Sequence, residues 1–183
     1  MTETHIDLAE NSYGAAPDLS GVNVFVGGPI QHALGNGEGF HAPLQNAIHD
    51  IIEAATAAKA TVFSAHVAEK FGVDTPLFTP DQVSVRDFNW MRRCDVFVPV
   101  LPVVSGELLR TDGTHIELGW ASAQDKPIVV VTPTPLAENA SHLLRGLPTV
   151  ARVKVVDLHQ AKRYPEALIG LLASVTGKVG AAT

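Results

Sequence analysis

The chain has 183 residues, 46% hydrophobic and 17% charged, with a net charge of −6 at pH 7. This acidic balance argues against a nucleic-acid polymer as partner, because binding to a phosphate backbone needs clustered lysines and arginines. No apolar run approaches the roughly 20 residues of a membrane helix, no secretory signal is recognisable, and the single cysteine, Cys94, permits no internal disulfide. We therefore expect a cytoplasmic protein without membrane contact: a flexible tail over residues 1–20, then a single domain over residues 21–178.

Short apolar segments alternate with helical patterns along the chain. The apolar segments predict strands at residues 22–26, 61–64, 95–101, 126–131 and 152–156. Helical periodicity predicts helices at residues 42–58, from 79 to about 94, from 114 to about 123 and at 164–175. In the second of these, Thr79 suits the N-cap and Pro80 the first helical position. This order predicts an α/β fold with a mainly parallel five-stranded sheet covered on both faces.

Polar residues follow the first three predicted strands, at their carboxyl ends. Residues 27–31 follow the first strand, His66 follows the second, and residues 105–117 follow the third. Ligands bind at this edge of parallel sheets, so the pattern predicts a site for a small molecule. The Gly27-Gly28-Pro29 turn would let backbone approach a ligand closely, but it is neither a dinucleotide fingerprint nor a phosphate-binding loop.

Two carboxylates are candidates for chemistry. Glu117 lies near the start of a predicted helix, where the helix amides would keep it ionised and able to attack an anomeric carbon. Asp87, on the preceding helix, would serve for acid/base work or sugar recognition. From the residues alone, the simpler interpretation of both is a solvated helix charge, and it is the favoured one. No histidine pair has a metal-ligand spacing, so we expect no metal and no cofactor.

Four blocks of the sequence, taken in order, resemble the nucleoside 2-deoxyribosyltransferase superfamily. The resemblance runs from about Val22 to Arg152, and the blocks are residues 24–30, 64–66, 86–98 and 113–127. It implies a flavodoxin-like fold that assembles at least as a homodimer. It also implies that Glu117 attacks C1′ of the sugar, and that Asp87 orients the sugar and protonates the leaving base. Water or a second base then resolves the glycosyl-enzyme.

Within the superfamily, the chain is most similar to the nucleotide N-hydrolases. The transferases carry an acidic residue six positions before the nucleophile, where this chain has Thr111. The hydrolases carry a serine there, and they receive another serine from the neighbouring subunit, in a segment resembling residues 141–146. The block around Glu117 is similar to CMP-type N-glycosidases of nucleoside-antibiotic pathways. The implied substrate-binding residues are Gly27, Gly28, Ile30, Gln31, His66, Thr111, Gly113, Thr114 and Ser141.

Two departures from the hydrolase pattern keep alternatives open. The hydrolases have an arginine aimed at the phosphate where this chain has Gln31, and Asp112 adjoins Thr111. The first hypothesis is hydrolysis of a nucleoside 5′-monophosphate, with a pyrimidine such as CMP favoured. The second is a deoxyribosyltransferase or hydrolase acting on unphosphorylated nucleosides. The third is a nucleotide-binding sensor without catalysis, since a fold does not guarantee chemistry.

Overall fold

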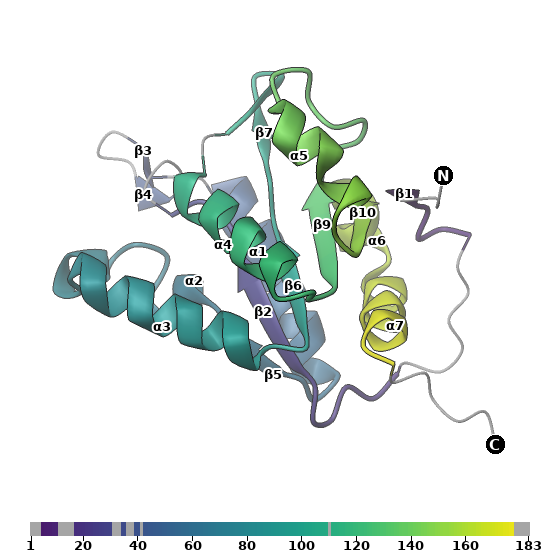
Figure 1. The fold of residues 1–183 in the computed structure, drawn as a ribbon, viewed down its shortest axis with the longest axis horizontal. Coiled ribbons are helices and arrows are strands. Elements are labelled where there is room, and N and C mark those ends of the chain that lie inside the picture. The colour runs from purple at the N-terminus through teal and green to yellow at the C-terminus, as the bar shows by residue number, and fades with distance from the viewer. Residues whose placement is uncertain are drawn as a thin grey trace.

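The computed structural model describes residues 5–10, 17–30, 34–35, 39–40, 42–109 and 111–177. Its centre is a six-stranded sheet in the order β1-β10-β9-β6-β2-β5, in which every pairing is parallel (Figure 1). The strands are β1 (His5–Ile6), β2 (Asn23–Gly27), β5 (Thr61–Phe63), β6 (Val96–Pro99), β9 (Ile128–Thr132) and β10 (Val153–Asp157). The predicted α/β fold with a mainly parallel sheet is confirmed.

The predicted number of five strands is wrong, because β1 adds a sixth. His5 and Ile6 pair with Val155 and Val156 of β10, at the edge of the sheet. This strand lies within residues 1–20, for which the sequence predicts a tail. Two residues carry no strand periodicity, and their pairing with β10 is a long-range contact that no local pattern reveals. The other five strands follow the order 2-1-3-4-5 in chain numbering, which is the flavodoxin-like order of a doubly wound sheet.

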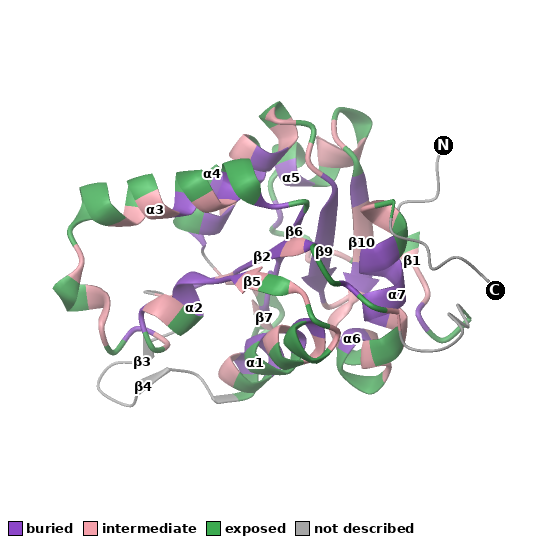
Figure 2. Cartoon of the chain, turned by 90° about the horizontal axis from the view of Figure 1, so that it is seen from below, coloured by how far each residue is buried: buried purple, intermediate pink, exposed green. Residues whose placement is uncertain are grey.

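Helices cover both faces of the sheet. One face carries α1 (Ala42–Ala57), α6 (Leu158–Arg163) and α7 (Pro165–Val175), and the other carries α3 (Pro80–Arg93), α4 (Asp112–Ala123) and α5 (His142–Gly146) (Figure 1, Figure 2). The shorter elements are α2 (Ala65–Ala68), the 3-10 turns η2 (Thr75–Leu77) and η3 (Leu147–Thr149), and two small hairpins, β3 (Leu34–Gly35) with β4 (Gly39–Phe40) and β7 (Val103–Val104) with β8 (Glu107–Leu108).

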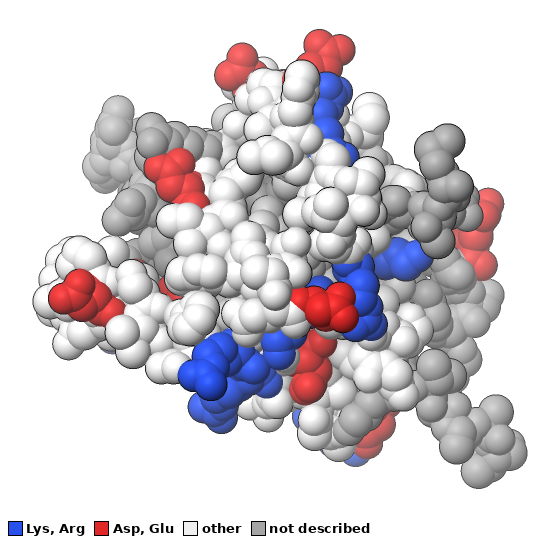
Figure 3. Space-filling model, viewed as in Figure 1, with Lys and Arg blue, Asp and Glu red and all other residues white. Residues whose placement is uncertain are grey.

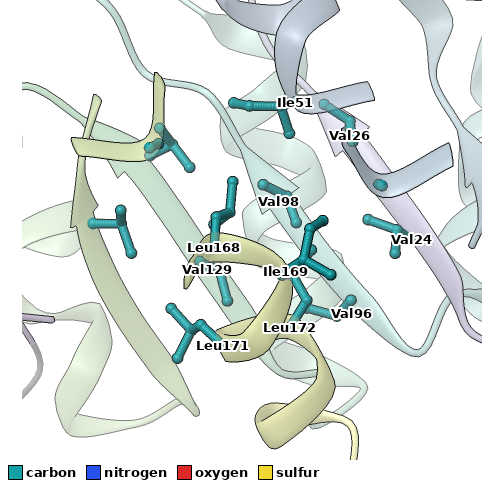
Figure 4. Packing of buried hydrophobic residues seen from close by; sticks show 14 of the residues in the cluster. Val24, Val26, Ile51, Val96, Val98, Val129, Leu168, Ile169, Leu171 and Leu172 are labelled. Atoms are coloured by element: carbon teal, nitrogen blue, oxygen red, sulfur yellow. The ribbon is translucent and has the colours of Figure 1, made fainter. Parts of the chain in front are cut away.

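Alternate residues of the central strands supply two separate hydrophobic cores. Val24, Val26, Val96 and Val98 meet α1 and α7, whose buried side chains include Leu168 and Leu172 (Figure 4). On the opposite face, Phe25 and Phe97 pack among the buried side chains of α3, α4 and α5, namely Met91, Leu118, Ala121 and Leu144. Because successive side chains of a strand point to opposite faces, one apolar run serves both layers.

The local signals of α3 place it where the sequence predicts. Thr79 is the N-cap, Pro80 is the first helical residue, and Thr79 and Gln82 form a capping box. The helix ends before Cys94, so the predicted bounds are confirmed. α4 begins at Asp112, two residues earlier than the predicted Thr114. Across the described residues, no helix has the length and apolar character required to cross a membrane.

Candidate active site

A cavity of about 210 Å³ opens at the carboxyl ends of β2, β5 and β6. The chain runs from β2 to β5 on one side and from β6 to β9 on the other, so β2 and β6 flank the point where the strand order reverses. Doubly wound sheets bind ligands at this point. The cavity is lined by Gly27, Gly28, Pro29, Ile30, Ala65, His66, Glu69, Thr75, Val83, Asp87, Thr111, Asp112, Gly113, Thr114 and Glu117.

Most of the candidate residues from the sequence meet around this cavity. They come from three places: the turn after β2, the start of α2, and the neighbouring helices α3 and α4. Gln31 lies outside the described residues. Ser141 does not line the cavity. It is the exposed N-cap of α5, and its hydroxyl accepts a hydrogen bond from the amide of Leu144 at 3.2 Å. Its predicted role in a neighbouring subunit stays a prediction.

Glu117 is a buried carboxyl in the second turn of α4. Burial raises its pKa well above the ordinary value, the charge of Asp87 raises it further, and Arg86 opposes both effects. The sequence-based expectation was that helix amides would keep this group ionised. The structure differs from that expectation, because Glu117 lies beyond the first turn and desolvation dominates.

Asp87 is the second buried carboxyl of the cavity and comes from α3. Burial raises its pKa, the hydrogen bonds and charge of Arg86 lower it, and the charge of Glu69 raises it. Asp87 and Glu117 repel each other when both are ionised, so the pair holds one proton over a range of pH. Two carboxyls with separated pKa values can divide the roles of nucleophile and acid between them.

His66 is fully buried and fixed through both of its ring nitrogens. Nε2 lies 3.2 Å from the carbonyl oxygen of Pro29, and Nδ1 lies 3.3 Å from the hydroxyl of Ser64. Burial lowers the pKa of His66 to about 4, so the ring is neutral at pH 7. A neutral ring that donates from Nε2 to Pro29 holds the turn after β2 in place. This arrangement leaves the ring itself, rather than its nitrogens, to contact a ligand.

Thr111 precedes α4 and is buried at the cavity wall. Nδ1 of His115 lies 2.7 Å from its hydroxyl oxygen and 2.8 Å from its carbonyl oxygen. A carbonyl oxygen can only accept, so Nδ1 must carry a hydrogen, and the hydroxyl of Thr111 also accepts from it. The hydroxyl proton of Thr111 therefore points away from His115 and can be donated to another acceptor.

Two charged residues that the sequence reasoning did not select as site residues belong to this region. Glu69 lines the cavity, and Arg86 bridges it to Asp87. Arg86 adjoins Asp87 in the sequence, but a basic residue on a helix carries no local signal of burial. Glu69 follows His66 by three residues, at the C-cap of α2, a short helix that the sequence pattern does not predict.

Four aromatic residues of β2, α3 and α4 lie away from the cavity. Phe25 and Trp90 belong to the core beneath α3, and Phe88 meets Trp120 edge to face at 5.2 Å. None of these four lines the cavity. Among the described residues, no group of three or more His, Cys, Asp or Glu side chains is arranged to hold a metal ion.

No protein-family model matches the sequence, and no curated protein does. Solved structures are similar. BlsM has 34% sequence identity over 92% of this chain and 99% of its own, with a TM-score of 0.65. The CMP N-glycosidase BcmB of Clostridium botulinum has 25% identity over 82% of this chain and 98% of its own, with a TM-score of 0.56. A flavo di-iron protein mutant of Thermotoga maritima, 11% identical, shares the fold over 88% of this chain and 37% of its own, with a TM-score of 0.50.

Proposed function

We propose that this chain, which belongs to the same family as BlsM, hydrolyses the N-glycosidic bond of a nucleoside 5′-monophosphate. The products are the free base and a (deoxy)ribose 5-phosphate, and a pyrimidine nucleotide such as CMP is the favoured substrate. The observation that carries the proposal is the pair of buried carboxyls, Asp87 and Glu117, on one cavity at the switch point of the sheet. The likeness to BcmB, a CMP N-glycosidase, supports the choice of reaction and base.

The proposed reaction has two steps. The carboxylate of Glu117 forms a bond to C1′ of the sugar while the bond from C1′ to the base nitrogen breaks. The base leaves with the electron pair of that bond and receives the proton of Asp87. Water then attacks C1′, Asp87 takes a proton from it, and Glu117 departs as a carboxylate. The pair thus begins and ends with one proton. In the unliganded protein the electrostatics favour that proton on Glu117, because Arg86 stabilises the ionised form of Asp87. The proposed reaction therefore starts from the form in which the proton has moved to Asp87.

The start of α4 is the proposed site of the 5′-phosphate. Thr111, Gly113 and Thr114 line the cavity there, and the first amides of a helix favour an anion. The hydroxyl of Thr111 accepts from His115, so its own proton can be donated to a phosphate oxygen.

Asp112 supports the second candidate function, cleavage of unphosphorylated nucleosides. Asp112 lines the cavity beside Thr111. A carboxylate there would repel a phosphate but would accept a hydrogen bond from a free 5′-hydroxyl. Transfer of the sugar to a second base belongs to the same alternative, because the glycosyl-enzyme can be resolved by either acceptor.

One substrate panel tests these alternatives. The protein is incubated with CMP, dCMP, purine monophosphates and the matching nucleosides, and the released base is measured by mass spectrometry. We expect base release from CMP or dCMP, and a loss of about 10³-fold or more in Glu117→Ala. Cleavage of nucleosides alone would refute the phosphate requirement, and new nucleoside formed with an added base would indicate transfer.

A homodimer is the proposed assembly, with Ser141 completing the neighbouring site. The face made by α3, α4 and α5 exposes several large apolar side chains, namely Val85, Phe88, Ile116 and Leu143. Figure 3 shows few charges over the centre of this face, and one group of basic side chains lies near the end of α3, where Arg92 and Arg93 lie. An apolar face of this kind is typical of a contact surface between proteins.

A further inference from the structure

Three charged side chains connect α2 to α3 beside the cavity. Nη2 of Arg86 donates to Oε1 of Glu69 at 2.6 Å, and Nε of Arg86 donates to Oδ1 of Asp87 at 2.7 Å. Nη2 also lies 3.3 Å from Oδ2 of Asp87. One guanidinium therefore holds two buried carboxylates, and only one of them, Asp87, has a part in the proposed reaction.

Arg86 also packs against two aromatic rings. Its guanidinium carbon lies 5.3 Å from the ring centre of Phe78 and 4.9 Å from that of Trp90. Trp90 is in turn stacked on Phe63, with ring centres 5.9 Å apart and planes 2° apart. These contacts restrict the movement of the guanidinium and add to the hydrogen bonds that direct its N–H groups.

Glu69 is the anchor of this arrangement. It is buried, and while one oxygen accepts from Arg86, the other accepts from the hydroxyl of Thr75. Adjacent residues of a helix do not face each other, so Arg86 and Asp87 would ordinarily diverge. The contact with Glu69, the C-cap residue of α2, directs the guanidinium to the place where it also meets Asp87.

We propose that Glu69 and Arg86 are positioning residues for Asp87. Glu69 anchors Arg86. Arg86 in turn fixes the direction in which the Asp87 carboxyl points at the cavity and sets how readily that carboxyl ionises. The catalytic consequence of this inference rests on the proposed function. The effect of Glu69 and Arg86 on Asp87 can be measured without turnover. The charged groups around Asp87 are Arg86 on its own helix, Glu69 from α2, and Glu117 and Asp112 from α4.

The first test uses two variants of Glu69 that should shift the pKa of Asp87 in opposite directions. The titration of Asp87 is followed by carbon NMR of carboxyl-labelled aspartate, with Asp87→Asn for assignment. Glu69→Gln removes a negative charge but can still accept from Arg86 and donate to Thr75, so the pKa of Asp87 should fall. Glu69→Leu also releases Arg86, so the pKa should rise above that of the wild type. A fall in both variants would mean that Glu69 acts only as a nearby charge and would overturn the inference.

The second test keeps the charge of Arg86 and removes its forked geometry. Arg86→Lys should raise the pKa of Asp87 and lower kcat about tenfold, with KM changed less than about threefold. Arg92→Lys, an exposed position on the same helix, is the matched control and should leave both values unchanged. An unchanged kcat in Arg86→Lys, or a loss confined to KM, would contradict the positioning role.

The two proposals fail separately. If no substrate is cleaved by the wild type, the proposed function fails, and the NMR titrations still decide the geometry around Asp87. If substrate is cleaved but the titrations of the Glu69 variants shift together, only the positioning role fails. Thermal unfolding of each variant identifies any that do not fold, and Arg86→Lys then supplies the titration in place of Glu69→Leu.

Discussion

Gly27 lies directly against the carboxylate of Glu117. A Cβ atom at this position would stand 2.7 Å from Oε2 of Glu117 and 2.9 Å from the ring of Phe97. The absence of a side chain at the end of β2 therefore lets the carboxylate lie over the backbone. Because the ring of Phe97 is buried in the core, it cannot move aside to make room.

We predict that Gly27→Ala lowers kcat by about 10²-fold, because a displacement of about 1 Å at a reacting group has costs of this order. Overpacking against Phe97 should also destabilise the protein by about 1–3 kcal/mol. The matched control is Gly119→Ala, an exposed position on α4 where an added Cβ would meet no atom within 4 Å. Equal losses of kcat in both variants would contradict a specific effect on the nucleophile.

The buried carboxyl of Glu117 should make the protein less stable as pH rises. Its pKa in the folded state lies above the ordinary value of 4.5, so the folded protein binds this proton more tightly than the unfolded chain does. The resulting stabilisation is fully present below about pH 4 and is lost as pH rises through the raised pKa. At neutral pH, ionising Glu117 therefore opposes folding.

We predict that Glu117→Gln unfolds at higher urea concentration than the wild type at pH 7–8, with a gain on the order of 1–3 kcal/mol. The gain should shrink toward zero as the pH approaches 4, since the wild-type carboxyl is then protonated in both states. Urea unfolding across this pH range is the measurement, and Glu138→Gln, at an exposed site, is the control. A gain that stays constant with pH would contradict the assignment.

At the scale of elements, α3 owes its start to a capping box that is independent of the cavity. The hydroxyl of Thr79 accepts from the amide of Gln82, and the side chain of Gln82 accepts from the amide of Thr79. Thr79→Ala should cost about 1 kcal/mol of stability with turnover within about twofold of the wild type. Thermal unfolding measures the cost, and Ser84→Ala, exposed on the same helix, should be close to neutral. A large loss of turnover in Thr79→Ala would show that the cap also sets the position of Asp87.

The sequence predicts elements well where the signal is local. The cap of α3 and the apolar runs of β2 and β9 are of this kind, and their predicted bounds agree with the structure within a few residues. α5 and α6 are short and carry no long apolar periodicity, so neither was predicted. The same distinction between local and long-range signals applies to the candidate site. Asp87 and Glu117 fall within sequence blocks that resemble a known superfamily, whereas the link from Glu69 through Arg86 exists only once α2 and α3 are folded together.

At the scale of the whole molecule, the proposed dimer predicts that two inactive variants restore each other. If Ser141 completes the neighbouring site, Glu117→Ala and Ser141→Ala should each be impaired as homodimers. Subunits mixed after mild dissociation should regain activity, because one site of the mixed dimer combines an intact Glu117 with an intact Ser141. Light scattering would measure the assembly. A monomer, or no recovery on mixing, would contradict the shared site.

The short strand β1 leaves less of β10 open to solvent at the edge of the sheet. The segment that follows it is held by Gln160, which accepts from the amide of Leu8 and donates to Asp7, each at 2.9 Å, and Leu8 itself is buried. Removal of residues 1–10 should uncover the N–H and C=O groups of β10 together with the apolar pocket of Leu8. An unpaired strand edge is a template for another chain. We therefore expect the shortened protein to aggregate on warming, which light scattering would measure. The control is Glu10→Ala, which keeps β1 and should stay dispersed at the same temperatures. Resistance to aggregation would then depend on a strand of two residues distant from the catalytic carboxyls.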